Sequence, residues 1–538
     1  MQKVLTAAEM REVDRLTTER YGIPSILLME NAAHAVARVI TEKLGGSVKG
    51  KRILILCGPG NNGGDGAALA RILWTMGANC FVYLFGSVDQ MHGDAKTNFE
   101  IVKKIDVSPE TNGPNENCLI LFENAESSNI QIQPKDSVVV DALFGTGIDR
   151  PVTGEIRKAL GLVQRELRRK IHLYVSLDLP SGLHSDRGEP IGENARANIT
   201  ISFTSPKAAN VLPPASDSNG QLIVANIGSP QELIDAQPSQ FYLAEREDPK
   251  SWLEQTRFTD DSYKNVRGHT LLIAGSESFS GAAVLAGNTA IRSGVGLVTI
   301  VTPRSSKDSV ASRVSPEVMV RGVAETGNGA ISEGAFEEIQ DLLEKANAIA
   351  IGSGLSQSES TRAFIEKVIE TCSQPIVVDA DGLNLLAPFA TKGETGNPLI
   401  LTPHEGEFMR LLGTDDKDVL KDRVAAVRGF SQKHNVILVL KGERVLIGEP
   451  GGKVVVNPTG NSGLGKAGNG DTLTGIIAGF VTQAAAMNID IFQTVVAAVY
   501  VAGMAGDVAE KKFGKRVMTA SDVRECLSEV FLTLNSEK

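Results

Sequence analysis

The sequence predicts an α/β protein with two domains, each built around a largely parallel β-sheet. Three observations support this fold class. Short, continuous apolar runs, which are typical of strands covered on both faces, alternate with helical segments through most of the chain. The alternation fades between residues 237 and 250 and then resumes. A chain of 538 residues also exceeds the size of one hydrophobic core, so its length favours two or three domains. We therefore expect a first domain over residues 1–235, a linker over 236–250 and a second domain over 251–538.

The first domain is predicted to begin with a helix, because Thr6 and Glu9 have the spacing of a capping box. Four apolar runs that follow are predicted to be strands: Lys51–Cys57, Cys80–Phe85, Ser137–Asp141 and Ile171–Asp178. Helical segments between them include Gly66–Met76 and Gly154–Arg169. Since parallel strands are joined by right-handed crossovers, this order indicates a doubly wound or sandwiched sheet.

The second domain repeats the alternation with new strands. The predicted strands are His269–Ala274, Leu297–Val301, Ala348–Ile351, Pro375–Asp379, Pro398–Thr402 and Val436–Leu440. Near its end, the strand-like run Lys453–Val456 leads through a glycine-rich segment into a helix over Thr472–Phe480. The second domain is therefore also expected to be doubly wound or sandwiched.

Composition excludes several classes of protein. Hydrophobic residues make up 42% of the chain, as in an ordinary globular protein, and the net charge of -10 argues against binding to nucleic acid or to a membrane surface. We see no apolar run of the length needed to cross a bilayer and no secretory signal at the N-terminus. The five cysteines are scattered, which is typical of reduced thiols in a cytoplasmic protein, and the seven histidines form no close pair for zinc.

The glycine-rich segment Asn457–Asp471 is the most informative part of the chain. A glycine-dense turn that opens a helix presents free backbone N–H groups at the positive end of the helix dipole, which makes an anion site. Asp471 would repel a phosphate, so it fits better as a base that acts on a hydroxyl approaching a phosphoryl group. The alternative is an ordinary helix cap, which needs neither this length nor this glycine content.

The loop Gly58–Gly66 matches the dinucleotide-binding pattern G-x-G-x-x-G between a predicted strand and a predicted helix. However, the next strand has no acidic residue at its tip to hold a ribose. Asn61, Asn62 and Asp65 also offer oxygen atoms where a bare phosphate requires donors. Such oxygens suit a cation, or the hydroxyl and amide groups of a ligand.

Two further strand ends carry matching chemistry. Asp141 and Asp178 each end a predicted strand, and Ser181 follows three residues after Asp178. Because the carboxyl ends of parallel strands share one crevice, Asn62, Asp141 and Ser181 would supply oxygens to one monovalent cation. Asp178 would then face the ligand.

Taken together, Gly60–Gly66, Asp141–Gly147, Asp178–Gly182 and Phe203–Lys207 resemble the NAD(P)HX epimerase family over roughly residues 1–230. The resemblance implies a Rossmann-like three-layer sandwich that interconverts the R and S forms of hydrated NADH and NADPH. It implies a potassium ion held by Asn62, Asp141 and Ser181, with Asp178 as the catalytic residue at the reacting ring. The implied substrate contacts are Asn61, Asn62, Gly63, Gly64, Asp65, Gly145, Thr146, Gly147, Ile148, Asp149, Arg150, Pro151 and Asp178.

The second half contains no Walker-type phosphate loop. Its strand ends Gly352–Leu355, Asp379–Asn384 and Thr402–Phe408, together with Asn461–Asp471, resemble the ribokinase-like superfamily over about residues 250–530. Within that superfamily they are similar to the ADP-dependent or ATP-dependent NAD(P)HX dehydratases. The resemblance implies a ribokinase-like α/β domain that uses ADP as phosphoryl donor with Mg²⁺, and in which Asp471 is the catalytic base.

The same resemblance implies two sets of contacts. Those with the hydrated nucleotide are Gly354, His404, Glu405, Gly406, Glu407, Phe408, Met409, Arg410 and Asp471. Those with ADP are Lys441, Gly442, Glu443, Arg444, Val445, Asn461, Ser462, Gly463, Leu464, Gly465, Lys466, Ala467, Gly468, Asn469 and Gly470. Ala467 and Asn469 depart from the residues that many members have at these positions, and Lys466 would add charge near the phosphate. These departures leave the choice between ADP and ATP open.

Three functions are therefore compared. The first is a bifunctional repair enzyme for NADHX and NADPHX, in which one half supplies the epimer that the other consumes. It would have no nucleic acid or membrane partner, and we expect it to form a homo-oligomer. The second is a small-molecule kinase with an accessory domain, which would release a stable phosphorylated product. The third is a non-enzymatic nucleotide-binding scaffold, which the presence of both Asp178 and Asp471 disfavours.

Overall fold

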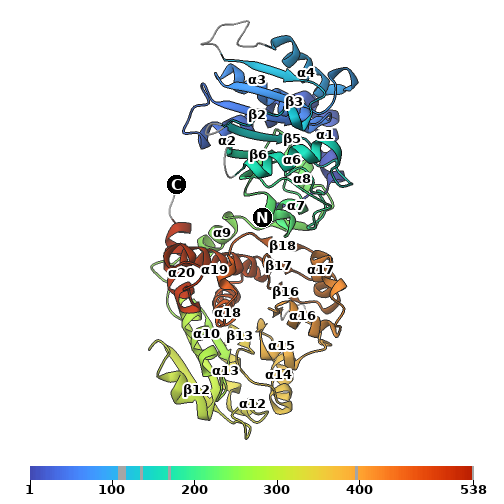
Figure 1. Cartoon of the computed structure of the whole chain (residues 1–538). Coiled ribbons are helices and arrows are strands. Elements are labelled where there is room, and N and C mark those ends of the chain that lie inside the picture. Colours follow the sequence, from blue (N-terminus) through green and yellow to red (C-terminus); the bar gives the residue numbers. More distant parts are fainter. Residues whose placement is uncertain (107–116, 134–136, 168–170, 394–397, 536–538) are drawn as a thin grey trace. The chain divides into compact units, whose positions relative to one another are not determined.

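The computed structural model describes residues 1–106, 117–133, 137–167, 171–393 and 398–535 (Figure 1). The chain forms two compact units. One comprises Gln2–Ser239, and the other comprises Met1 and the residues from Gln240 onward. Each unit has its own sheet and its own core, and each is described separately below.

The sheet of the first unit is entirely parallel. Its strands are β2 (Arg52–Cys57), β3 (Asn79–Leu84), β4 (Leu119–Phe122), β5 (Ser137–Ala142), β6 (Ile171–Leu177), β7 (Ile199–Phe203) and β8 (Gln221–Ala225). Their order is β4-β3-β2-β5-β6-β7-β8. The strand order therefore reverses between β2 and β5, where an open parallel sheet forms a crevice beyond its carboxyl edge.

Helices cover both faces of this sheet. They are α1 (Ala7–Tyr21), α2 (Ser25–Lys43), α3 (Asn61–Thr75), α4 (Gly93–Ile105), α6 (Gly154–Glu166), α7 (Ala208–Val211) and α8 (Gln231–Asp235). Ile53 and Ile55 of β2 pack with α2, α3 and α4 on one face. Leu54 and Leu56 pack with α6 on the other. Because all four side chains are fully buried, each contributes about 1.5–3 kcal/mol to folding. This three-layer arrangement confirms the predicted α/β sandwich.

The sheet of the second unit is mixed. Its strands are β9 (Phe241–Leu243), β10 (His269–Ile273), β11 (Leu297–Pro303), β12 (Val318–Val323), β13 (Ala348–Ile351), β14 (Ile376–Val378), β15 (Leu399–Leu401), β16 (Ile437–Leu440), β17 (Val445–Gly448) and β18 (Val454–Asn457). From β9 onward the order is β9-β18-β17-β16-β15-β14-β13-β10-β11-β12. Only β17 runs antiparallel to both of its neighbours in this series. The predicted α/β class is confirmed here as well.

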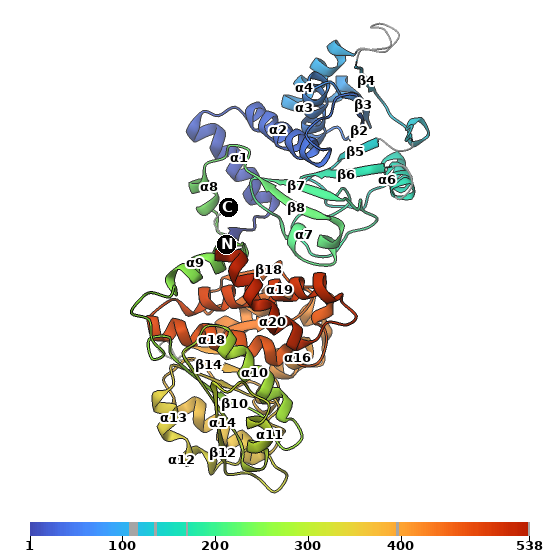
Figure 2. The ribbon, with the colours of Figure 1, turned by 90° about the vertical axis from the view of Figure 1, so that its left-hand side faces the viewer.

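The second unit also contains helices, several of which pack against this sheet (Figure 2). They are α9 (Glu247–Gln255), α10 (Ser280–Arg292), α11 (Lys307–Ala311), α12 (Ala335–Glu338), α13 (Gln340–Lys345), α14 (Glu359–Thr371), α15 (Asp381–Leu385), α16 (Glu405–Leu412), α17 (Arg423–His434), α18 (Asn469–Met487), α19 (Ile491–Phe513) and α20 (Ala520–Asn535). Helix α18 lies in the core, where Phe480 stacks on Trp252 with ring centroids 3.8 Å apart. A Cβ atom on Gly475 would lie 2.4 Å from the carbonyl oxygen of Ala286, so α18 approaches α10 too closely for any larger residue. This contact fixes the helix that carries Asp471.

Several boundaries differ from the prediction. Helix α3 begins at Asn61 rather than Gly66, so the polar loop residues form its first turn. The predicted linker 236–250 contains β9 and the start of α9, because Phe241–Leu243 pair with β18 in the second sheet. Helix α18 runs beyond both ends of the predicted segment. The predicted helix Gly154–Arg169 is observed to Glu166, and its residues 168 and 169 lie outside the described residues.

One helix runs counter to the expectation that no apolar run is long enough to cross a membrane. Helix α19 has the length and composition that a membrane span would require. Most of its apolar window is buried inside the protein, where Val495, Val499 and Ala505 belong to the core of the second unit. Its position in the core accounts for its apolar sequence.

Candidate functional sites

The turn from β2 into α3 is shaped by its glycines. A Cβ atom on Gly58 would lie 2.0 Å from the carbonyl oxygen of Leu143, and one on Gly63 would lie 1.9 Å from that of Gly58. Larger residues are therefore excluded, and the chain passes directly from the strand into the helix. As a result, Asn61 and Asn62 stand at the crevice where the strand order reverses.

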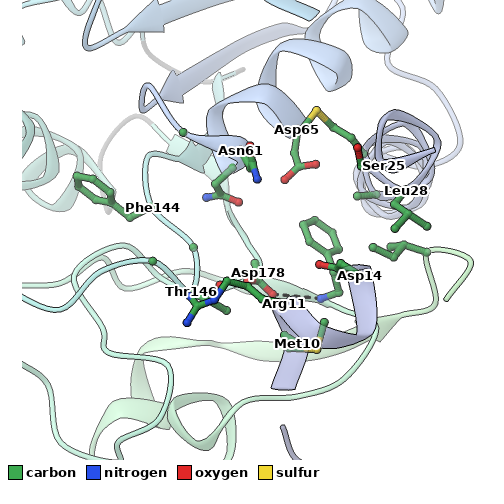
Figure 3. A pocket seen from close by; sticks show the side chains of 18 of the residues that line it. Met10, Arg11, Asp14, Ser25, Leu28, Asn61, Asp65, Phe144, Thr146 and Asp178 are labelled. Atoms are coloured by element: carbon green, nitrogen blue, oxygen red, sulfur yellow. Dashed lines mark hydrogen bonds between the residues drawn. The ribbon is translucent and has the colours of Figure 1, made fainter. Parts of the chain in front are cut away.

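A cavity of about 570 Å³ lies in the first unit (Figure 3). Its walls come from α1, α2, the start of α3, the segment after β5, and the ends of β6 and β7. Asn61 and Asp65 point into it from α3, and Asp14 and Asp178 lie on its opposite side. This volume suits a ligand of nucleotide-fragment size.

Asp178 is held in a defined position by a buried lysine. It directly follows β6 and has a positive φ of 63°, a conformation that is strained for a residue with a side chain. The side chain of Lys207 is 1% exposed, and its amine forms an ion pair with Asp178 Oδ1 and donates to the carbonyl of Phe203 at 3.0 Å. The Oδ2 atom lies 3.3 Å from the Cβ position of Gly145, which also lines the cavity. One carboxylate oxygen is therefore anchored, and the other is near the ligand.

Asp141 and Ser181, two of the three predicted potassium ligands, are in direct contact. Asp141 is fully buried and accepts from the hydroxyl of Ser181 at 2.5 Å and from its backbone N–H at 2.8 Å. Burial raises the pKa of Asp141, and the bonds from Ser181 oppose this rise. No cationic side chain bonds to Asp141 among the described residues. A buried carboxylate without a cation is a suitable ligand for one.

The third predicted ligand, Asn62, lies close by. Its Oδ1 is 3.6 Å from the Cβ position of Gly145, and the residue before Gly145, Phe144, donates its N–H to the Ser181 hydroxyl at 3.0 Å. Asn62 Nδ2 is buried without a hydrogen-bond partner in the described structure. Within that part of the chain, no cluster of three or more Asp, Glu, His or Cys side chains is arranged to hold a metal. The site would instead rely on amide, hydroxyl and single carboxylate oxygens.

The predicted substrate contacts divide into two groups. Those that line the cavity are Asn61, Asn62, Asp65, Gly145, Thr146, Gly147 and Asp178. Those that do not are Gly63, Gly64, Ile148, Asp149, Arg150 and Pro151. A Cβ atom on Gly64 would lie 2.8–2.9 Å from atoms of Ala95 and Met29, so this glycine serves the packing of α3 on α4 and α2.

Sequence reasoning missed the wall formed by the N-terminal helices. Met10, Arg11 and Asp14 of α1 line the cavity, as do residues of α2. The helical spacing of Met10 and Asp14 places them on one face, but nothing in the sequence shows that this face meets the carboxyl edge of a distant sheet. Lys207 was noted only as part of a Pro-Lys turn, and its ion pair with Asp178 spans 29 residues.

In the second unit, Asp471 lies in the first turn of α18, as predicted. The helix is capped by Gly468, which has a φ of 89°. A Cβ atom on Gly468 would lie 2.7 Å from Leu285 of α10, so both the conformation and the packing require glycine. The first N–H groups of a helix have no partner within it, and α18 therefore presents donors beside the Asp471 carboxylate.

The pKa of Asp471 is raised to about 6, because the carboxylate is buried and lies close to that of Asp379. Asp379 is 1% exposed and follows β14. It accepts from the Lys441 amine at 2.8 Å, from Thr402 at 2.8 Å and from Thr474 of α18 at 2.7 Å. Burial alone would raise the pKa of Asp379, but the Lys441 ammonium holds it below its ordinary value.

Lys441 stands at the N-terminus of α18. Its Nζ lies 3.8 Å from the Cβ position of Gly470 and 3.8 Å from a carboxylate oxygen of Glu407. Burial alone would lower the pKa of Lys441, but the carboxylates of Asp379 and Glu407 raise it. A permanent cation and free helix N–H groups thus lie beside a carboxylate that titrates near neutral pH, an arrangement that suits phosphoryl transfer to a hydroxyl.

The glycine-rich segment before α18 is held by hydrogen bonds to α19 and to the loop that follows it. Asp507 of α19 accepts from Gly460 N–H and from the Asn461 amide, each at 3.0 Å. Lys466 donates to the carbonyls of residues 515, 516 and 518 at 2.8–2.9 Å. The amine of Lys466 therefore links two loops, rather than adding charge toward a phosphate as we expected. The Oδ1 atom of Asn469 is buried without a partner in the described structure.

The segment 404–410 forms α16 and its cap. His404 caps the helix, since its Nδ1 accepts from Glu407 N–H at 3.2 Å while Glu407 accepts from His404 N–H at 2.9 Å. Phe408 is fully buried against Phe430, so its ring is unavailable to a ligand. Arg410 donates to Asn384 at 2.9 Å. Of this predicted set, Glu407 lies 3.8 Å from the Lys441 amine, and His404 forms a β-bridge with Lys441.

Gly354 and the Lys441–Val445 segment border the same region. Gly354 has a φ of 65°, and a Cβ atom there would lie 2.9 Å from Phe279. A Cβ atom on Gly442 would lie 2.5 Å from the Arg423 guanidinium, which also lies 3.4 Å from Glu405. Val445 begins β17.

Comparison with known proteins identifies both units. A family model described as NAD(P)H-hydrate dehydratase matches residues 270–529, and one described as YjeF-related protein N-terminus matches residues 25–209. The bifunctional NAD(P)H-hydrate repair enzyme Nnr of Moorella thermoacetica is 37% identical over 538 residues, which cover 99% of this chain and 97% of the relative. The enzyme of the same name from Thermofilum pendens is 33% identical, with the same coverage.

Among solved structures, the ADP/ATP-dependent NAD(P)H-hydrate dehydratase of Bacillus subtilis, co-crystallised with ATP/Mg²⁺, is 31% identical with a TM-score of 0.48. It covers 55% of this chain and 99% of its own. One family model matches within each of the two units, and the full-length relatives span both. The chain therefore belongs to the bifunctional NAD(P)H-hydrate repair enzymes, and it combines an NAD(P)HX epimerase with a nucleotide-dependent NAD(P)HX dehydratase.

Proposed function

We propose that Asp471 is the base of the dehydratase and that ADP is its phosphoryl donor. The hydroxyl on the hydrated ring is a poor leaving group. Asp471 takes the proton of this hydroxyl while the terminal phosphoryl group of ADP is transferred to the hydroxyl oxygen. The products are AMP and a phosphorylated hydrate. Phosphate then leaves with the electron pair of its bond to carbon, while the lone pair of the ring nitrogen forms a C=N⁺ bond. The adjacent ring carbon then loses a proton to solvent, and the electron pair of that C–H bond forms the ring double bond and neutralises the nitrogen, which restores NADH or NADPH.

The observation that supports this role is the position of Asp471. Its pKa of about 6 lets it accept a proton near neutral pH, and the N–H groups of α18 lie beside it. Each such donor is worth about 2.7–4 kcal/mol for a developing negative charge. Lys441 stands where its ammonium would contact the transferred group. The nucleotide would lie along Lys441–Val445 and Asn461–Gly470.

Mg²⁺ would accompany the nucleotide, since the Bacillus subtilis dehydratase was co-crystallised with ATP/Mg²⁺. Its chemistry would be to neutralise phosphate charge. No cluster of acidic side chains arranged for a metal occurs in the part of the chain that the structure describes, so the phosphates would supply most of its ligands.

In the epimerase, we propose that Asp178 exchanges the proton of the ring hydroxyl. Its free oxygen is turned toward Gly145 at the cavity wall, while Lys207 holds the other. Asn62, Asp141 and Ser181 would hold the potassium ion, whose positive charge would compensate the buried Asp141 carboxylate. The buried Asp141 carboxylate, which accepts from Ser181 and from no cationic side chain in the described part of the chain, supports such a role.

The decisive experiment mixes the R and S forms of hydrated NADH with the full chain, Mg²⁺ and either ADP or ATP, and follows the absorbance of the reduced nicotinamide. Full recovery with ADP is the expected result, because the R portion must be epimerised before it reacts. Recovery only with ATP would overturn the choice of donor. A stable phosphorylated hydrate instead of NADH would contradict the proposed dehydration.

Two further features complete the proposal. All five cysteines are free and buried, which suits a reducing cytoplasm. We also propose a homo-oligomer, which size-exclusion chromatography with light scattering will test, and a monomer at micromolar concentration would contradict it.

A further inference from the structure

Four carboxyl groups line the epimerase cavity, and they differ in their partners. Asp178 is ion-paired with Lys207, and Asp94 accepts from the Ser25 hydroxyl at 2.5 Å. Asp14 and Asp65 have no side-chain hydrogen bond within the described residues. The cavity therefore contains one anchored carboxylate near the ligand and two carboxyl groups that are not used by the fold.

Asp14 is not required to hold α1 in place. The helix begins with the capping box of Thr6 and Glu9, and its apolar face packs with Leu5, Leu233 and Ile234. Asp14 instead lies one turn after Met10 and turns toward the cavity (Figure 3), with its Oδ1 atom buried and unpaired. A buried acceptor without a partner costs about 1–3 kcal/mol, so its retention at a cavity wall favours a role toward the ligand.

Epimerisation requires a proton to be given as well as taken. When the bond between the ring nitrogen and the carbon that bears the hydroxyl breaks, the hydroxyl proton passes to a base and its electron pair forms a carbonyl. The electron pair of the broken bond stays on nitrogen, which takes a proton from an acid. After rotation of the free carbonyl, the reverse steps close the ring on the opposite face. One base and one acid therefore suffice, without any redox partner.

We propose that Asp14 is this acid: it protonates the ring nitrogen as Asp178 takes the hydroxyl proton, and it takes that proton back on closure. The proposal rests on the role proposed for Asp178 and extends it to a pair of residues on the same side of the cavity. Lys207 distinguishes the two members, because its ammonium is bonded to Asp178. Asp178 is thus the carboxylate held by an ion pair, and Asp14 is the one that no ion pair holds.

The charged surroundings of Asp14 agree with this assignment. Burial raises its pKa to about 6, Lys207 opposes the rise and Asp178 adds to it. Arg11 lines the same wall. Asp65, 9% exposed, has a pKa well above its ordinary value because of burial and of the neighbouring Asp178 and Asp14. A group that titrates near the working pH transfers protons most effectively.

The test compares Asp14→Asn, Asp14→Glu and Asp178→Asn with Glu12→Gln, a control on the exposed side of the same helix. Epimerisation of the R form is measured through the coupled dehydratase, with the spontaneous rate subtracted. We expect Asp14→Asn to lower kcat by about 100-fold or more with little change in KM, Asp14→Glu to restore part of it, and Glu12→Gln to have no effect. Dehydration of the pure S form must remain normal in all four, and the thermal unfolding of the first unit must match that of the native chain, which shows that this unit is folded.

The pH profile supplies an independent readout. In the native enzyme, epimerisation should decline above pH 6 as Asp14 loses its proton, and Asp14→Asn should abolish this decline. Normal kcat in Asp14→Asn with an inactive Asp178→Asn would overturn the role of Asp14 alone. Normal kcat in both would overturn the role of Asp178 as well. Loss of activity in Asp65→Asn with a normal Asp14→Asn would assign the acid to Asp65.

Discussion

At the scale of single residues, the two sites have a similar arrangement of charged side chains. Each holds a carboxylate near the substrate and a lysine that is paired with a buried acid: Lys207 with Asp178 in the epimerase, and Lys441 with Asp379 in the dehydratase. The difference is which acid acts. In the epimerase the paired carboxylate lines the cavity and is itself the proposed base. In the dehydratase the proposed base is Asp471, and the charge of the paired Asp379 raises its pKa.

Substitution of Asp471 by Asn should abolish dehydration and leave epimerisation intact. Loss of a general base lowers kcat by about 10²–10⁴-fold. The S form is the substrate for the measurement, and binding of ADP by calorimetry should be retained. Unchanged turnover of the S form would eliminate Asp471 as the base.

The same substitution should stabilise the second unit at pH 8. The folded-state pKa of Asp471, about 6, lies above the ordinary 3.8, so between these values the folded state binds more protons than the unfolded state. The free energy of unfolding therefore falls as the pH rises through that window. Above pH 6 the full destabilisation caused by the buried Asp471 carboxylate is present. Because one pKa unit corresponds to about 1.36 kcal/mol, Asp471→Asn should recover roughly 1–3 kcal/mol. Thermal unfolding of both proteins at pH 5 and pH 8 checks this, and an equal Tm difference at both values would contradict it.

Asp379→Asn should shift the pH profile of dehydration. The Asp379 charge raises the pKa of Asp471, so its removal lowers that pKa. Since the base must be ionised, the rise of kcat with pH should move to lower pH. The control is Asp422→Asn, which changes a helix cap of α17. A profile that stays in place would show that Asp379 does not tune the base.

At the scale of elements, the dehydratase site depends on how closely α18 approaches α10. Gly475→Ala would place a methyl group 2.4 Å from the carbonyl of Ala286 and force the helices apart. Such overpacking costs about 1–3 kcal/mol, and it should also lower dehydratase kcat, because it displaces the helix that carries Asp471. Gly281→Ala on α10, where a Cβ atom meets nothing within 4 Å, is the matched control. Equal Tm and kcat in the two variants would contradict this account.

At the scale of the whole molecule, the two activities should be separable. Asp178→Asn should convert the S portion of a mixture at the native rate and leave the R portion to spontaneous epimerisation. Asp471→Asn should epimerise without dehydrating. A mixture of the two variants should convert both forms, because the S form that one variant produces can diffuse through solution to the dehydratase of the other. Failure of the mixture, with each single activity intact, would show that the substrate must pass between sites of one chain.

Local sequence patterns predict the fold class and the polar residues at the strand ends. Apolar runs and glycine turns are local patterns, so the strands around Asp141, Asp178 and the start of α18 could be predicted from them. Tertiary structure alone decided which residues complete each site. Asp14 lines the same cavity as Asp178, and Lys207 forms an ion pair with Asp178. Lys466 donates to backbone carbonyls instead of facing a phosphate, and Phe408 is buried in the core. The local pattern of apolar residues and glycines determines whether a segment is a helix or a strand and where it ends. Where a side chain points and which residue it contacts depend instead on packing between segments far apart in the sequence.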